Sequence, residues 1–397
     1  MLSDNEIEKL LQPIVDRQNT IGSYIIQKIA KRVGEIKNLS PDELRRLEQL
    51  LKSGNDLQDI KDKIEEYTEL NAQEIDNVLY KIAEDSYEDA KSTFKDVDNP
   101  LDAFINNKTI QKLINVFILA AVQKYLSMLD IVFMLGSSKD SERLVPRNIE
   151  NTYKFVTSRA IQAARSKAIK YDTAMIVLLR QLADSGARYV LKGEAGTYTQ
   201  QIDVYLKQWL LNNVRDLTQQ VQDEIAKQVG ADGKEISAHI FSAPDHEPIQ
   251  GHQFTNAEFE KLQTEQPFED INGNQFDAIR RPIGMWNCKH YTRAIIVGVT
   301  KPLHTQKELD ENIQKNRAGY TDASETHRTL YNCSLEQRRI ERLIRQTKRE
   351  ILAGNASENA SLVEYATARL ARYENLYKIF SRECKLPVNE DNCKIFR

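Results

Sequence analysis

Apolar residues return every three to four positions along most of this chain. Near the N-terminus, isoleucine, leucine and valine keep this spacing from Ile7 to Val33, which predicts a long amphipathic helix. The segment SPDE at 40–43 has the pattern of a capping box with proline in the first helical turn, so a second helix is expected to begin there. The same apolar spacing predicts further helices at about 56–66 and 72–94.

The most apolar stretch of the chain covers 109–135. Lys112 and Asp130 are among the polar residues that interrupt it, so no apolar block reaches the roughly 20 residues that a membrane-spanning helix needs. We interpret the stretch as a helix in the protein core, although a helix buried against a neighbouring subunit would show the same pattern. Two long helices are expected after it, at about 148–187 and 201–229.

The helical pattern stops between 237 and 299. Prolines and glycines are frequent in this window, and β-branched residues gather in short runs at 236–242 and 291–299, as they do in strands. The window is therefore predicted to form a small α+β module. Polar residues dominate the segment that follows, 304–331, which we interpret as a linker or a surface loop.

Two more helices are predicted near the C-terminus. Apolar residues from Ile340 to Ile351 lie on one helical face, and a second helix is expected at about 358–382. The last residues, 384–397, are expected to be extended.

These patterns predict a mainly α fold, in which a long-helix domain carries a small α+β module inserted near 235–300. We divide the chain into four consecutive parts: an N-terminal helical region at 1–100, a central helical domain at 101–234, the module at 235–300, and a C-terminal linker, basic helix and tail at 301–397.

Composition and charge narrow the function. The chain has 397 residues, and its charged residues nearly cancel to a net charge of −3, so the protein as a whole is not expected to bind polyanions. Any contact with nucleic acid must come from a local basic surface. The chain has four cysteines and no secretory signal pattern, so we expect assembly in a reducing cytoplasm, without a disulfide framework.

The module contains most of the residues that could bind a metal. Cys288 and His290 are two positions apart, so in an extended segment both side chains leave the same face. His239 and His246 bracket a proline-containing turn that could fold back towards them. Zinc prefers nitrogen and sulfur ligands in a tetrahedral arrangement, and these four residues supply a Cys-His₃ set. The sequence therefore predicts a structural zinc site.

Neighbouring residues add a supporting role and leave alternatives open. Asp245 is expected to accept a hydrogen bond from a ligand imidazole, and His252 is a substitute ligand if the turn runs differently. The histidines could instead hydrogen-bond within the module without a metal. Cys288 with His246 or His239, and with Asp245, also has the composition of a cysteine-nucleophile triad.

A row of arginines follows the module. Arg338, Arg342, Arg345 and Arg349 step by four, three and four positions along one predicted helix. Guanidinium groups bind phosphate in a bidentate way, so this basic helix could contact DNA or a partner. Glutamates such as Glu341 lie nearby, and the alternative is a solvated or salt-bridged face.

Several distinctive segments follow one another along the chain. They are TSRAIQAARSKAI at 157–169, LADSGARYV at 182–190, GTYTQQIDVYL at 196–206, SAHIFSAPDHEPIQG at 237–251, NCKH at 287–290 and LYNCSLEQRRIERLIRQTKREI at 330–351. Their order resembles one known family, phage minor capsid protein 2, a minor head protein of tailed bacteriophages. The resemblance covers about 150–352.

The family pattern extends to the candidate ligands. Its His, Asp-His, Gln-Gly and Asn-Cys-Arg-His elements fall on His239, on 245–246, on 250–251 and on 287–290. Ala243 and Lys289 stand where the family has arginine, and Lys207-Gln208 replaces a basic pair, which weakens an expectation of phosphate binding at those positions.

The resemblance implies a structural, non-enzymatic protein present in few copies at or near the portal of the phage head. It implies support of head assembly and of genome packaging or delivery. The implied partners are the portal protein, other capsid proteins and further copies of the chain, with packaged DNA reached through the basic helix and no membrane. The implied location is the virion, and the host cytoplasm during assembly. A cysteine-dependent hydrolase and a soluble DNA-binding protein are the alternatives.

Overall fold

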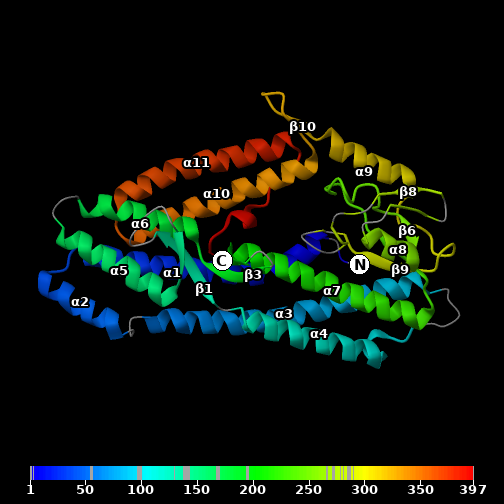
Figure 1. Ribbon diagram of the computed structural model, residues 1–397, viewed down its shortest axis with the longest axis horizontal. Helices are drawn as coiled ribbons and strands as arrows, with labels where there is room; N and C mark the ends of the chain where they lie inside the picture. Colours follow the sequence, from blue (N-terminus) through cyan, green and yellow to red (C-terminus); the bar gives the residue numbers. More distant parts are fainter. Residues whose placement is uncertain are drawn as a thin grey trace. The chain divides into compact units, whose positions relative to one another are not determined.

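The structure is a computed structural model, and most of the residues that it describes lie in helices (Figure 1). The described residues are 2, 4–53, 57–95, 101–128, 130–136, 144–166, 170–193, 196–264, 267–270, 273–277, 279, 281–283, 288 and 290–396.

The chain forms two compact units that interleave along the sequence, whereas the sequence analysis divides it into consecutive parts. Unit 1 comprises Met1–Gln12, Gln73–Lys124 and Gln208–Glu336. Unit 2 comprises Pro13–Ala72, Tyr125–Lys207 and Gln337–Arg397.

The helices and strands have the following bounds. The longer helices are α1 (Asp4–Ile36), α2 (Pro41–Ser53), α3 (Gln58–Thr93), α4 (Lys108–Leu126), α5 (Ile149–Arg165), α6 (Tyr171–Ser185), α7 (Ile202–Val229), α8 (Asn256–Gln263), α9 (Gln306–Ala318), α10 (Leu330–Ala356) and α11 (Ala360–Glu383). The strands are β1 (Ile131–Gly136), β2 (Leu144–Asn148), β3 (Arg188–Gly193), β4 (Gly196–Gln201), β5 (Gly233–Ile236), β6 (Gln253–Thr255), β7 (Phe268–Glu269), β8 (Gln275–Phe276), β9 (Thr292–Ile295), β10 (Tyr320–Thr321) and β11 (His327–Arg328). Short 3-10 helices lie at Phe104–Asn106 and Glu390–Cys393.

The N-terminal helices follow the apolar spacing of the sequence. The predicted capping box begins α2, because the Ser40 backbone N–H donates to the Glu43 carboxylate at 2.8 Å and the Glu43 N–H donates back to the Ser40 hydroxyl at 3.4 Å. The helices expected at 56–66 and 72–94 are one continuous helix, α3.

The prediction of a single core helix over 109–135 is wrong in its second part. Helix α4 ends at Leu126, and the residues that follow Asp130 form strand β1. This strand lies between β2 and β3 in an antiparallel sheet of order β2-β1-β3-β4, and its residues are nearly all buried. A strand covered on both faces is apolar at every position, so its periodicity cannot be told from that of a buried helix.

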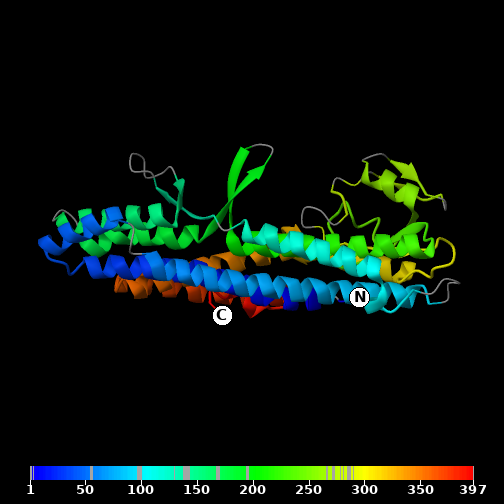
Figure 2. The same cartoon turned by 90° about the horizontal axis from the view of Figure 1, so that it is seen from below.

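The helix expected over 148–187 is two helices, α5 and α6. Helix α5 begins where the Asn148 side chain accepts a hydrogen bond from the Asn151 backbone N–H at 2.8 Å. Residues 167–169, between the two helices, lie outside the described residues. Strands β3 and β4 pair between the helices expected at 148–187 and 201–229, and Figure 2 shows this hairpin extending away from α1.

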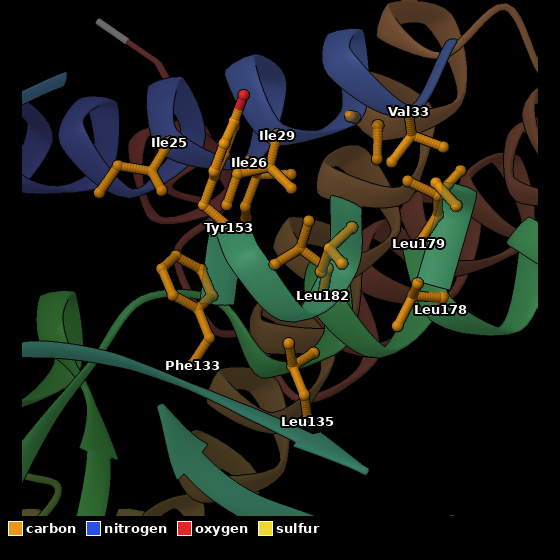
Figure 3. Close-up of a cluster of buried hydrophobic side chains, with 14 of the residues drawn as sticks. Ile25, Ile26, Ile29, Val33, Phe133, Leu135, Tyr153, Leu178, Leu179 and Leu182 are labelled. Atoms are coloured by element: carbon orange, nitrogen blue, oxygen red, sulfur yellow. The ribbon is translucent and has the colours of Figure 1, made fainter. Parts of the chain in front are cut away.

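The core of unit 2 joins α1, α5, α6 and β1. Figure 3 shows isoleucines and a valine of α1 facing aromatic and aliphatic side chains of β1, α5 and α6. These buried residues are Ile25, Ile26, Ile29, Val33, Phe133, Leu135, Tyr153, Leu178, Leu179 and Leu182.

Helices α10 and α11 lie side by side in unit 2 (Figure 1). Arg369 of α11 donates to both carboxylate oxygens of Glu350 of α10, at 2.9 and 3.0 Å. The C-terminal tail, expected to be extended, includes a short 3-10 helix and binds its own chain. Its Asn389 backbone N–H donates to the Tyr377 hydroxyl at 3.1 Å, and its Ile395 carbonyl accepts from Ser23 at 2.7 Å.

Unit 1 contains the predicted α+β module. Strand β5 pairs antiparallel with β6 and with β9, giving a sheet of order β6-β5-β9, and α8 packs beside it. Apolar side chains from these elements and the β7-β8 hairpin form the module core: Ile236, Ile249, Phe254, Leu262, Phe268, Phe276 and Ile279.

The linker predicted at 304–331 is wrong for most of its length. It contains helix α9 and the β10-β11 hairpin. A capping box between Thr305 and Glu308 starts α9, and Leu309 is one of its few buried residues. The helix is so polar that its sequence shows little apolar periodicity, which is why the pattern predicted a loop.

Candidate metal centre

The sheet of unit 1 brings two distant segments to one edge. Ile236 at the end of β5 pairs with Thr292 at the start of β9, and Glu235 pairs with Gln253 at the start of β6. The segment leaving β5 and the segment entering β9 therefore meet at the same end of β5. The Ser237 backbone N–H donates to the Tyr291 carbonyl at 2.9 Å, which extends this pairing towards the candidate ligands.

Three of the four predicted ligands come together there. Each of His246, Cys288 and His290 offers a ligand atom that lies within 4.8 Å of the other two. Cys288 Sγ is 3.2 Å from His246 Nδ1 and 3.4 Å from His290 Nδ1. Tetrahedral zinc would separate a sulfur and a nitrogen ligand by about 3.5 Å, given bonds of about 2.3 and 2.0 Å. The three side chains fit a zinc ion with little rearrangement.

The same three side chains are almost inaccessible to solvent. His246, Cys288 and His290 are 1%, 3% and 1% exposed. A buried Cys-His group of this kind has the character of a structural site, because a catalytic site must keep a position open to substrate.

Asp245 does not accept the hydrogen bond that was expected from a ligand imidazole. The Asp245 carboxylate is 3.7 Å from His246 Nε2, beyond hydrogen-bond distance, and accepts two hydrogen bonds from Arg281 at 2.9 and 3.2 Å. His246 Nε2 instead donates to the Arg281 backbone carbonyl at 2.6 Å. That bond fixes the proton on Nε2 and leaves Nδ1 facing the cysteine sulfur. Asp245 therefore binds the side chain of Arg281, while the backbone carbonyl of the same arginine accepts from His246.

Electrostatics differ between the two histidines. Burial lowers the pKa of His246. The hydrogen bond and the charge of Cys288 raise it by more than burial lowers it, so the pKa of His246 is above its usual value. Burial, then the neighbouring His239 and His246, hold the pKa of His290 well below its usual value. His290 is therefore neutral at pH 7, which is the form that binds a metal.

The fourth predicted ligand, His239, and its substitute, His252, are not members of this group. The His239 ring stacks on His290 with centroids 4.2 Å apart, but His239 is not part of the three-residue group. His252 lies against Phe276, with ring centroids 5.5 Å apart, in the aromatic core of the module. Asn287 and Lys289 of the NCKH motif lie outside the described residues.

Helix α9 supports the turn that carries His246. The Glu247 carboxylate accepts hydrogen bonds from Asn316 at 2.9 Å and from Arg317 at 2.8 Å. Gly251 has a φ of +74°, and a Cβ there would lie 2.4 Å from a methyl carbon of Leu309. The glycine of the Gln-Gly motif therefore permits both the turn and the close approach of α9.

Sequence reasoning missed Arg281 and α9 as parts of this site. The position of Arg281 in the sequence could have pointed to this site, since it stands seven residues before Cys288 in the segment RRPIG. Its contribution, however, is a backbone carbonyl and an ion pair to Asp245, and only the folded chain shows either. Helix α9 was not predicted because most of its residues are polar, and Leu309 is one of the few that are buried.

The prediction that α10 presents four arginines on one basic face is wrong for two of them. Arg338 and Arg342 of α10 are exposed, but Arg345 and Arg349 are only 8% and 5% exposed. Arg345 lies 3.2 Å from the Asp203 carboxylate, and Arg349 Nε donates to the Ala183 carbonyl at 2.9 Å. The four arginines do not form one exposed row, because the helix turns two of them into the core of unit 2.

The fold and site define a class: a mainly helical protein whose small α+β module holds a buried histidine and cysteine group. A family model, "Phage minor capsid protein 2", matches residues 2–380. The chain therefore belongs to the phage minor capsid protein 2 family, as the sequence resemblance predicted. Membership implies a structural role in the capsid, a place in the virion, and other capsid proteins as partners.

Other comparisons add no relatives. None of the curated proteins matches this chain. No solved structure matches it either. Among the described residues, every helix is too short or too polar to cross a membrane.

Proposed function

We propose that this protein is a low-copy structural component of the phage head, at or near the portal, where it supports assembly and genome packaging or delivery. Family membership over residues 2–380 supports the capsid role. The partners in this proposal are the portal protein, other capsid proteins and further copies of the chain, assembled in the host cytoplasm.

The proposal assigns the module a zinc ion held by His246, Cys288 and His290. The observation that carries it is the convergence of these three buried ligand atoms from two segments of the chain. Zinc would tie the turn after β5 to the residues that enter β9. His239, stacked on His290, or a water molecule completes the coordination.

Such a tie suits a structural component. The module core is small, and small cores gain much of their stability from metals or other cross-links. A module made rigid in this way presents a fixed docking surface to a capsid partner.

Elemental analysis of the purified chain tests this function. We expect close to one zinc per chain, and a chelator should lower the thermal stability of the module. A chain that folds fully and carries no zinc under metal-replete conditions would refute the zinc part of the proposal. Localisation in particles, by labelling residues of the module, tests the position near the portal.

A second candidate function, a cysteine-dependent hydrolase, draws on the 3.2 Å approach of Cys288 Sγ to His246 Nδ1. The burial of both groups opposes it, since substrate must reach the sulfur. Reaction of the metal-replete chain with iodoacetamide separates the two: a nucleophilic thiolate is alkylated quickly, whereas a zinc-bound buried thiolate is protected.

The exposed part of the basic helix is proposed to contact packaged DNA through Arg338 and Arg342. Binding should be weak, strongly dependent on salt and nearly independent of sequence, because phosphate contacts do not read bases. Sequence-selective binding would instead favour a DNA-binding regulator. A salt titration with two DNA duplexes of unrelated sequence distinguishes these outcomes.

A further inference from the structure

Unit 2 contains a small cavity that its capsid role does not explain. Its lining comes from α1, from the turn between α6 and β3, from the start of α7 and from α10. The lining residues are Asn19, Gly22, Ser23, Gly186, Ala187, Gln201, Ile202, Asp203 and Arg349.

Arg349 is the unusual member of this lining. Its side chain is buried, and Nε donates to the Ala183 carbonyl at 2.9 Å. Among the described residues, Nη2 has no hydrogen-bond acceptor. Burial lowers the pKa of Arg349 to about 10, so the group keeps its positive charge at neutral pH. A buried charged donor without an acceptor is costly, and a bound partner would remove that cost.

The backbone around the guanidinium is shaped for close approach. Gly186 ends α6 with a φ of +58°, and a Cβ there would lie 3.2 Å from the Arg349 guanidinium. Ile202 and Asp203, which also line the cavity, are the first residues of α7, and the Ile202 N–H donates to the Ala187 carbonyl at 3.0 Å. The first backbone N–H groups of a helix have no partners within the helix and carry a partial positive charge, which favours an anion.

The single carboxylate in the lining does not cancel this charge. Asp203 lies 3.2 Å from Arg345, so its negative charge is already paired. Asp203 and Asp184 also attract the Arg349 charge, but Nη2 donates to neither, so it remains a buried donor without an acceptor among the described residues.

We propose that this cavity binds one monatomic anion of the chloride type, held by Arg349 Nη2 and the N-terminus of α7. The cavity has a volume of about 10 Å³, which is room for one small ion or one water molecule. Phosphate and carboxylate ligands are too large. The ion would link α1, α6, α7 and α10 where the core of unit 2 is polar.

Thermal unfolding of the full chain tests the proposal. Sodium chloride is titrated against sodium gluconate at constant sodium concentration, since gluconate is too large for the cavity. We expect the Tm to rise with chloride by roughly 2–4 °C and then to saturate, as mass action requires for one site. In Arg349→Met this chloride-specific rise should disappear. The matched control is Arg342→Met, which removes an exposed arginine from the same helix and should keep the rise.

The wild-type chain alone can overturn the proposal. An identical Tm in chloride and gluconate at every ratio would show that water occupies the cavity. Should Arg349→Met fail to fold, Arg349→Lys keeps the charge without the forked donor, and its chloride midpoint should rise several-fold. Anomalous diffraction from wild-type crystals in sodium bromide gives an independent readout: a peak within hydrogen-bond distance of Arg349 Nη2 supports the site, and its absence refutes it.

Discussion

The metal centre of unit 1 and the arginine cavity of unit 2 are both buried polar clusters, but they are built in opposite ways. In unit 1, nitrogen and sulfur ligands converge from two segments that one strand, β5, holds together. In unit 2, a charged donor of α10 lies near the N-terminus of α7, in a cavity that α1 and the end of α6 also line. The first arrangement suits a cation and the second an anion.

The two clusters differ in how much the stability of their unit depends on them. The module has a small apolar core, so its metal ligands form a large part of what keeps it ordered. Unit 2 has an extensive core around α1 and β1, so its polar cluster adjusts a fold that apolar packing already determines. Removing a key residue from each cluster should therefore have unequal effects.

The largest effect is expected from Cys288→Ser. Loss of a thiolate ligand should abolish zinc binding and destabilise the module by about 3 kcal/mol or more, a part of the roughly 10–16 kcal/mol that structural zinc can contribute. Hydrogen exchange should show lost protection in β5 and β9 and unchanged protection in α6 of unit 2. An equal loss of hydrogen-exchange protection in both units would show that the metal centre does not stabilise the module selectively.

A matched control is Cys333→Ala, which removes a buried thiol of unit 1 outside the metal centre. This variant should lose some stability because it leaves a cavity, but it should keep its zinc. Loss of zinc from the control would mean that metal content reports general unfolding and not ligation.

Gly251→Ala should have the next largest effect. A methyl group at this position would meet Leu309, and the φ of +74° is strained for any residue with a Cβ. We expect a loss of roughly 1–3 kcal/mol from the module, measured by chemical denaturation, with zinc still bound. Leu309→Ala in the same background should recover part of the loss, because it opens space for the added methyl group.

The sequence predicted the metal centre but not the arginine cavity. His246, Cys288 and His290 stand in short motifs with unusual residue types, and β5 pairing with both β6 and β9 is what makes their convergence possible. Arg349 was instead grouped with Arg338 and Arg342, because helical spacing alone cannot show which face a helix buries when both faces carry charge. Its neighbours in the cavity, such as Gly22 and Gly186, are more than 150 residues apart in the sequence.

The fold shows the same limit. Long amphipathic helices such as α1, α7 and α11 follow directly from their apolar spacing. Strand β1 and helix α9 did not, since the first is apolar on both faces and the second is polar on nearly all of them. In both elements, tertiary contacts determine the structure and periodicity carries little information.

The stability of unit 2 should depend on pH through Glu350. Glu350 is fully buried beside Asp184, and burial together with the Asp184 carboxyl raises the pKa of Glu350 to about 7. A carboxyl group whose pKa is higher in the folded than in the unfolded chain stabilises the fold at pH values below its unfolded pKa. That stability is lost as the pH rises through the folded pKa, here about 7. The Tm of unit 2 should therefore fall between pH 5 and pH 8.

The variant Glu350→Gln tests the origin of this pH dependence. The amide cannot ionise but keeps a carbonyl oxygen for Arg369, so its Tm should vary less with pH than that of the wild type. A variant that keeps the full wild-type slope would assign the titration to another group. The module of unit 1 does not contain Glu350, so hydrogen exchange at β5 should be the same in both proteins.

The smallest effect is expected from His239→Ala, and it decides how the metal coordination is completed. If His239 stacks on His290 without binding the ion, the variant should keep zinc at full stoichiometry with an affinity reduced less than about 10-fold, as for the loss of a supporting group. His246→Ala, which removes one of the three clustered ligands, should lose zinc under the same conditions. Competition with a chromophoric chelator measures both affinities. Equal loss in the two variants would make His239 a ligand of the bound state, which the ring could reach only by leaving its stack on His290.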